Sequence, residues 1–201
     1  MKTRFKLLVL IPFVFAAPTL MAETSGFSVT ADLGAARQSA EGDSGNAVSA
    51  ALGLSYQFNS NWSASLSYID FGQPDVYEFS DSIGDDILYN ATLSLDTTGF
   101  GLQAQYMTDR MTGHWSFGGR AGLVRWDTDI NVEVDGMMDA NGTVASDSGV
   151  AFSAGVIAAY AINDQLDLTL SADFMNYSMD FEDEEGDIDT SRLAAGVKYH
   201  F

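Results

Sequence analysis

The sequence contains no cysteine among its 201 residues. Disulfide bonds and a lipoprotein anchor on an N-terminal cysteine are therefore excluded. Basic residues are scarce as well, because nine Lys and Arg stand against 28 Asp and Glu, which gives a formal net charge of −19. A chain this acidic is repelled by phosphate backbones, so we expect no nucleic-acid partner.

Beyond the N-terminus, the sequence has no apolar run of the roughly 20 residues that a transmembrane helix needs. The N-terminus itself has three basic residues within 2–6, an apolar run over 7–17 and a small residue, Ala22, before a polar segment. This layout predicts a secretory signal peptide over residues 1–22. It would remove three of the nine bases and no acid, which leaves residues 23–201 with 28 acids, six bases and a charge of −22.

Apolar residues still make up 46% of the chain, too many for a disordered acidic protein. They alternate with small or polar residues, which predicts β-strands with one apolar face. The alternation runs through eight segments: residues 27–37, 50–58, 62–68, 100–106, 115–126, 152–162, 166–174 and 193–201.

The connections between these segments alternate in length. Short connections cover residues 59–61, 108–114 and 163–165, and long acidic ones cover 38–48, 73–89, 128–149 and 179–191. Short periplasmic turns and long extracellular loops are typical of outer-membrane barrels. We therefore predict an all-β fold: an eight-stranded antiparallel transmembrane β-barrel, preceded by the cleaved signal peptide. The alternative is a soluble sandwich or lipocalin-like barrel with its apolar stripes turned inward.

A transmembrane barrel assigns roles to two further groups of residues. Aromatic residues near strand ends are expected to form an interfacial girdle; these are Tyr56, Phe58, Trp62, Tyr106, Trp115 and Tyr160. Polar residues on the inward faces are expected to form a lumenal salt-bridge network, because unpaired charges inside a membrane protein are costly; these are Asp32, Gln103, Arg120, Asp167, Asp173, Arg192 and Lys198. Side chains fill the interior of a barrel this narrow, so we expect no open pore.

Two segments resemble the OmpA-like outer-membrane β-barrel family, a porin family of Gram-negative bacteria. Residues 54–72, with an Asn-Ser-Asn turn before Trp62, resemble a hairpin of that family, and residues 98–102 resemble its next strand. The ending, with Val197, Tyr199 and Phe201, resembles the signal by which the outer-membrane assembly machinery recognises its substrates. The resemblance implies an outer-membrane location. We expect no peptidoglycan-binding domain after the barrel, so a cell-wall tether is not implied.

The predicted long loops carry most of the acids, above all residues 180–189. Clustered carboxylates suit divalent cations, although the spacing does not match an EF-hand. The favoured interpretation is a solvated acidic rim that contacts outer-membrane lipids and bridges lipopolysaccharide through such cations.

For function, the sequence favours a structural and surface-interaction barrel without enzymatic activity or a cofactor. The alternative is a narrow channel or a carrier for small or hydrophobic molecules. A lipid-modifying enzyme is the third interpretation, but it needs a base beside a nucleophile. His114 and His200 are the two histidines, and neither adjoins a distinctive Ser motif.

Overall fold

The computed structural model describes residues 26–201, apart from 41–42, 84–85, 112, 137–139 and 182–183. The predicted signal peptide lies outside these residues. The strands are β1 (Phe27–Ala40), β2 (Asp43–Gln57), β3 (Trp62–Asp70), β4 (Asp75–Ile83), β5 (Asp86–Met107), β6 (Trp115–Gly136), β7 (Ala140–Ala161), β8 (Leu166–Phe181) and β9 (Glu184–His200). None of the described residues forms a helix that is long and apolar enough to cross a membrane.

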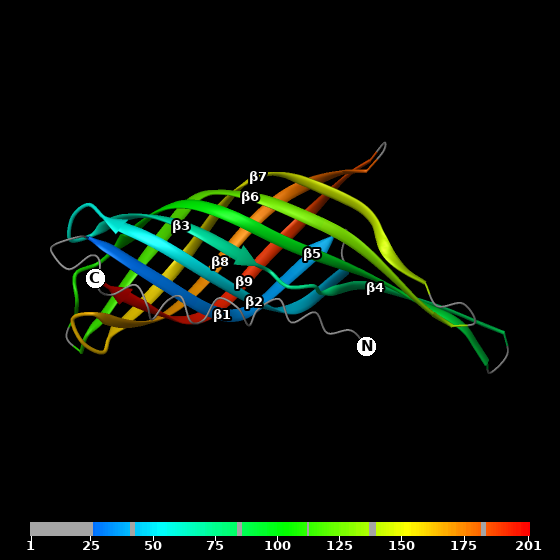
Figure 1. The fold of residues 1–201 in the computed structure, drawn as a ribbon, viewed down its shortest axis with the longest axis horizontal. Coiled ribbons are helices and arrows are strands. Elements are labelled where there is room, and N and C mark those ends of the chain that lie inside the picture. The colour runs from blue at the N-terminus through cyan, green and yellow to red at the C-terminus, as the bar shows by residue number, and fades with distance from the viewer. Residues whose placement is uncertain (1–25, 41–42, 84–85, 112, 137–139, 182–183) are drawn as a thin grey trace.

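Antiparallel pairing closes eight of these strands into a barrel (Figure 1). The order is β3-β2-β1-β9-β8-β7-β6-β5, and β5 pairs back to β3. β4 follows β3 after a break at residues 71–74 and pairs with the earlier part of β5. At the break, Gly72 has a φ of 77°, and its amide donates to Asp70 Oδ1 at 2.8 Å. Pro74, which has no N–H, fits this break. The predicted eight-stranded antiparallel barrel is confirmed.

The half of the barrel nearest the short turns carries its apolar residues outward. We call this belt the apolar band. Its exposed members include Leu33, Leu54, Leu66, Phe100, Leu102, Leu123, Phe152, Val156, Leu168, Leu170, Phe174, Leu193 and Val197. Many buried inward positions at this level are polar, and the apolar ones are mostly alanines; the polar ones include Ser55, Ser63, Gln103, Gln105, Ser153, Thr169 and Arg192. The outward orientation excludes the soluble alternative, in which these stripes would form the core.

Beyond the apolar band, the orientation of the apolar residues reverses. On β8, Phe174 is 50% exposed, whereas the next residue, Met175, is 3% exposed, and the buried inward row continues through Tyr177 and Met179. On β6, Leu123 is 55% exposed and Val124 only 1%. The outer surface therefore turns polar above the band while the interior turns apolar, as expected where a barrel leaves lipid and enters water.

The four predicted long loops are consequently a wrong prediction. Most of their residues belong to strands: β1 runs to Ala40 and β2 begins at Asp43, and β6, β7, β8 and β9 extend through most of 128–149 and 179–191. Residues 73–89 are largely taken up by β4 and the start of β5. Described acids such as Asp127, Asp187 and Asp189 alternate with buried inward-facing residues, so they occupy the outer face of extended strands.

Above the band, the wall of the barrel separates into two sheets. Pairing between β7 and β8 ends at Phe152 and Asn176, and pairing between β2 and β3 ends at Ala50 and Asp70. One sheet then contains β2, β1, β9 and β8, and the other contains β4, β5, β6 and β7. In Figure 1 the β8–β9 hairpin leaves the barrel in a different direction from the β4–β5 and β6–β7 hairpins.

Candidate functional site

The first lumenal ion pair joins Arg120 of β6 to Asp173 of β8. The guanidinium donates from Nε to Oδ1 at 2.6 Å and from Nη2 to Oδ2 at 2.5 Å, a bidentate geometry. Gly155 of β7 lies between the two residues in the register. A Cβ at Gly155 would lie 2.2 Å from Asp173 Oδ1, so the absent side chain leaves room for the pair.

A second pair joins Arg192 of β9 to Asp32 of β1, and Arg192 Nε also donates to Ser49 Oγ at 2.9 Å. Gln103 of β5 donates from Nε2 to Ser153 Oγ of β7 at 2.8 Å. The structure thus shows two ion pairs and one hydrogen-bonded pair instead of a single connected network. The identity of the acid that pairs with Arg120 depended on the strand register, which sequence alone does not provide.

The remaining two predicted lumenal residues lie towards the short-turn rim. Asp167 Oδ2 accepts a hydrogen bond from His200 Nε2 at 2.9 Å, and Asp167 Oδ1 lies 3.7 Å from Arg110 Nη2. Lys198 stands opposite Asp167 in the β8–β9 register but forms no ion pair with it within 4.0 Å. Arg110 was not predicted as part of the network.

The lumen at the level of the apolar band encloses a cavity of about 60 Å³. Six of the seven predicted lumenal residues line it: Asp32, Gln103, Arg120, Asp173, Arg192 and Lys198. The cavity exceeds the roughly 15 Å³ that one water needs, so it has room for a few waters or a small ion. Phe71, Val124 and Met175 line it as well, and all three are buried in the apolar cluster above.

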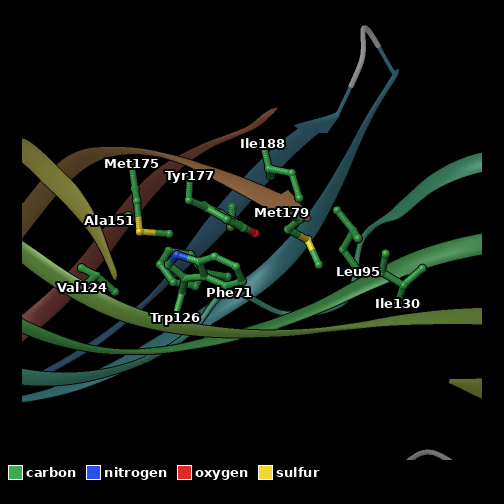
Figure 2. Close-up of a cluster of buried hydrophobic side chains, with 11 residues drawn as sticks. Phe71, Leu95, Val124, Trp126, Ile130, Ala151, Met175, Tyr177, Met179 and Ile188 are labelled. Atoms are coloured by element: carbon green, nitrogen blue, oxygen red, sulfur yellow. The ribbon is translucent and has the colours of Figure 1, made fainter. Parts of the chain in front are cut away.

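That cluster, which we call the upper core, fills the space between the two sheets (Figure 2). Its members are Ala36, Phe71, Leu95, Val124, Trp126, Ile130, Ala151, Met175, Tyr177, Met179 and Ile188. Trp126 of β6 and Tyr177 of β8 join the sheets, with ring centroids 4.3 Å apart and an interplanar angle of 34°. A Cβ at Gly149 would lie 2.8 Å from the Trp126 ring, so this glycine of β7 admits the indole.

A small polar cluster lies inside the upper core. Thr97 Oγ1 lies 3.0 Å from Thr128 Oγ1 and 3.0 Å from Gln38 Oε1. The Tyr177 hydroxyl lies 3.4 and 3.3 Å from the two threonine oxygens. Gln38, Thr97 and Thr128 are completely buried. These contacts tie β1, β5, β6 and β8 together where β7 and β8 no longer pair.

Sequence reasoning missed the upper core, although the sequence holds a signal for it. Two apolar residues become adjacent where the alternation changes face, at Leu123-Val124 and at Phe174-Met175. In a strand with apolar residues on one face only, apolar residues are not adjacent. Each of these two adjacent pairs therefore marks the upper edge of the apolar band.

The predicted girdle residues lie around the short-turn rim. Trp62 contacts Tyr106 at 5.2 Å between ring centroids, and Trp115 contacts Tyr160 at 5.2 Å. Tyr56 contacts Phe58 at 5.5 Å. In the C-terminal segment, Tyr199 contacts Phe201 at 5.2 Å, and Val197 is exposed in the band. Their proximity to one rim fits the expected interfacial positions.

The two histidines lie in different environments. His114 occupies a turn with a φ of 71°, and its ring lies 6.0 Å from that of Tyr160. His200 pairs with Asp167 and stands opposite Ser28 in the β1–β9 register. A Ser, a His and an Asp thus lie near one another, but no hydrogen bond joins Ser28 to His200 in the described part of the chain.

Among the described residues, no group of three or more His, Asp and Glu side chains is arranged to hold a metal ion. Most of the acids behind the divalent-cation prediction are not tested by this finding. Glu78, Asp81, Asp85, Asp86, Asp135, Asp139 and the acids of 180–185 lie outside the side chains that the structure describes.

Comparison with solved structures supports the same fold. The chain is similar to Neisserial surface protein A (NspA), with 18% identity, a TM-score of 0.64 and coverage of 89% of this chain and 100% of that chain. OprG from Pseudomonas aeruginosa shares 12% identity with a TM-score of 0.51, covering 89% of this chain and 97% of that chain. Ail, the attachment invasion locus protein of Yersinia pestis, was solved with the heparin analogue sucrose octasulfate; it shares 15% identity with a TM-score of 0.50, covering 88% and 100%.

No curated protein matches the chain significantly. The profile of the family described as "Outer membrane protein beta-barrel domain" matches residues 7–201, nearly the whole chain. The resemblance to OmpA-like barrels is thereby confirmed. The chain belongs to the outer membrane protein β-barrel family and is located in the outer membrane of a Gram-negative bacterium.

Proposed function

We propose that this protein is a closed barrel with a structural and surface-interaction role in the outer membrane. The upper core is the observation that carries the proposal. It packs side chains from both sheets against one another above the polar cavity, and three of its members, Phe71, Val124 and Met175, also line that cavity. An apolar, closely packed layer excludes hydrated ions, so the barrel should anchor its extended hairpins at the cell surface without conducting.

Single-channel recording in planar bilayers tests the closed state. The unmodified protein should give no steady current. The triple variant Trp126→Ala, Ile130→Ala, Met179→Ala empties the upper core and should open a measurable conductance. The outward variant Leu123→Ala lies on the same strand as Trp126 and serves as the control. Steady current through the unmodified protein would refute the closed barrel.

The surface-interaction role rests on strand edges that the two-sheet arrangement leaves unpaired. Over residues 140–151, the side of β7 that faces β8 pairs with no strand of the described part of the chain. Its outward Val144 and Val150 are exposed. Such an edge accepts an extended segment of another protein as an added strand. One amide of this edge already has an acceptor, because Ser148 N donates to Asp147 Oδ1 at 2.7 Å.

Adhesion and agglutination by cells that produce the protein test this edge. Ser146 and Ser148 have the same parity on β7, so the amide of Ser146 should also face the unpaired side. Ser146→Pro should therefore reduce adhesion while the barrel still assembles. The outward Asp127→Asn on β6 is the control, and equal adhesion by the Ser146→Pro variant would count against β7 as the contact.

The ligand of Ail does not transfer to this chain. Sucrose octasulfate is a polyanion, and the outer face above the band carries Asp96, Asp127, Asp187 and Asp189 as exposed acids. Arg37 and Arg125 are exposed at the upper edge of the band. The acids would repel a polyanion. Lipopolysaccharide phosphates could instead meet the two arginines directly and the acids through divalent cations.

Two further proposed partners are the outer-membrane lipids and the assembly machinery. The aromatic girdle places amphipathic rings where outer-membrane lipid headgroups lie. The final strand, with Val197, Tyr199 and Phe201 near its end, is proposed as the segment that the assembly machinery recognises. Deleting Phe201 should reduce the amount of assembled barrel in the outer membrane, as measured by heat-modifiable mobility on gels.

Two alternative functions have observations in their favour. The polar cavity favours a narrow channel or carrier, and the conductance experiment addresses it. The neighbouring Ser28, His200 and Asp167 favour a lipid-modifying enzyme. We propose no enzymatic activity, because this row lies inside the barrel near the rim. Loss of lipid turnover in both His200→Gln and Ser28→Ala would overturn that view.

A further inference from the structure

The cations of this acidic protein are concentrated in its lumen. Residues 23–201 contain six Lys and Arg against 28 Asp and Glu. Three of the six, Arg120, Arg192 and Lys198, line the cavity, against only two carboxylates, Asp32 and Asp173. The cavity lining therefore carries a formal charge of +1, whereas residues 23–201 as a whole carry −22.

Both carboxylates of the lining are already paired with guanidinium groups. Asp173 holds Arg120, and Asp32 holds Arg192. Lys198 is left over, since it forms no hydrogen bond or ion pair with any described residue. Asp167, opposite Lys198 in the register, interacts with the ammonium electrostatically from beyond 4.0 Å and makes its direct contacts with His200 and Arg110. An ammonium with no carboxylate in direct contact is costly in the low dielectric of a membrane-spanning barrel.

Hydroxyl groups lie in the same row of the sheet as Lys198. The register runs from Lys198 of β9 to Thr30 of β1, Gly53 of β2 and Ser67 of β3. All four residues line the cavity. Ser67 Oγ is buried without a hydrogen-bond partner. A Cβ at Gly53 would lie 3.8 Å from Ser67 Cβ and 3.9 Å from Thr30 Cβ, so the glycine leaves room for about one methyl-sized group between the two side chains.

We propose that the lumen holds a small inorganic anion, such as a halide, beside Lys198. The ammonium supplies the compensating charge, and the hydroxyls of Thr30 and Ser67 donate hydrogen bonds to the ion. The cavity of about 60 Å³ admits a halide but not a bulky organic anion. The anion gives the unpaired ammonium and the unpartnered Ser67 hydroxyl a common ligand, and it brings the lining to neutrality.

Bromide is the probe, because it replaces chloride and scatters anomalously. The protein is refolded in sodium bromide, crystallised and measured at the bromine absorption edge. An anomalous peak beside Lys198 Nζ is expected in the unmodified protein and in Lys198→Arg, and it should be absent in Lys198→Met. A missing peak in the unmodified protein, or an unchanged peak in Lys198→Met, overturns the site.

Thermal unfolding gives a second readout. Replacing gluconate by chloride at constant ionic strength should raise the Tm of the unmodified protein by about 2–4 °C, as expected for an ion present at several times its Kd. Lys198→Met should lose this shift, and the exposed control Arg125→Met should keep it. If Lys198→Met does not refold, Ser67→Ala decides: a reduced shift and a weaker bromide peak support the site, and unchanged values overturn it.

Discussion

The apolar band and the two sheets above it are built from the same strands with opposite polarity. In the band, Leu170 faces outward and Asp173 faces the lumen; a few residues farther along β8, Asn176 is exposed and Tyr177 is buried. Lipid covers the outer surface of the band, and water covers the outer surface above it. Apolar side chains therefore point outward in the band and inward above it. One continuous strand can therefore contribute to two cores of different chemistry.

The two interiors are also stabilised differently. The lumen of the band depends on ion pairs and hydrogen bonds around a small cavity, whereas the upper core depends on contacts among apolar side chains. Substitutions that differ only in level along the strand should distinguish these two mechanisms.

The largest effect is expected from Trp126→Ala. Removing the indole should lower the free energy of unfolding by about 3–5 kcal/mol, because it leaves a cavity beside Tyr177 in the upper core. Leu123→Ala, three residues earlier and facing outward, should cost less because lipid fills the space that it leaves. Urea titration of protein refolded into lipid vesicles measures both. Equal losses would mean that the upper core is not closely packed.

The second-largest effect is expected from an arginine on the outer face, because its cost in stability should differ between the apolar band and the region above it. Leu170→Arg puts a charge in the middle of the band and should cost about 2–4 kcal/mol. Asn176→Arg, on the same face of β8 but above the band, should change stability by less than about 0.5 kcal/mol. The same vesicle titration provides the values. A large cost at both positions would place the membrane boundary farther along the strands.

Gly155→Ala tests the Arg120–Asp173 ion pair in the lumen of the band. The added Cβ would approach Asp173 Oδ1 to 2.2 Å and displace it from Arg120. We expect a loss of about 1–3 kcal/mol, the usual cost of overpacking. Gly119→Ala on β6 is a mild control, since a Cβ there would meet only Gly155 O, at 3.5 Å. An unchanged Gly155→Ala variant would show that the ion pair has room to shift.

The smallest effect is expected from Tyr177→Phe. Its hydroxyl lies 3.4 and 3.3 Å from Thr97 and Thr128. Its loss should cost about 0.5–1.5 kcal/mol, while the contact with Trp126 remains. Hydrogen exchange of β8 amides above Asn176 should quicken selectively. A loss as large as that of Trp126→Ala would assign the joining of the sheets to the polar cluster instead.

The parts of this architecture that depend on local pattern could be predicted from the sequence. Two-residue alternation identified all eight barrel strands. The contrast between short turns and long acidic connections predicted the outward direction of their stripes, although most of each long connection is strand. The partner of Arg120 could not be predicted, because Arg120 and Asp173 meet across a third strand whose register is set by the closed barrel.

The extension of the strands was missed for a different reason. Acidic residues such as Asp187 and Asp189 suggested loops, because charge interrupts the apolar stripe of the band. The inward partner between them, Ile188, is almost completely buried. The alternation continues there with its apolar residues on the inward face. It can be recognised only if the outer face of one strand is expected to pass from lipid into water.

The reversal of polarity along β8 can be tested by spin-label scanning, and the absence of cysteine makes single-cysteine variants straightforward. Nitroxides placed one at a time at positions 168 to 179 would be measured for collision with oxygen, which concentrates in lipid, and with a water-soluble nickel complex. We predict high oxygen accessibility at even positions through 174, nickel accessibility at 176 and 178, and protection from both reagents at 175, 177 and 179. Nickel accessibility at 177 and 179 would show a water-filled mouth and contradict the closed upper core.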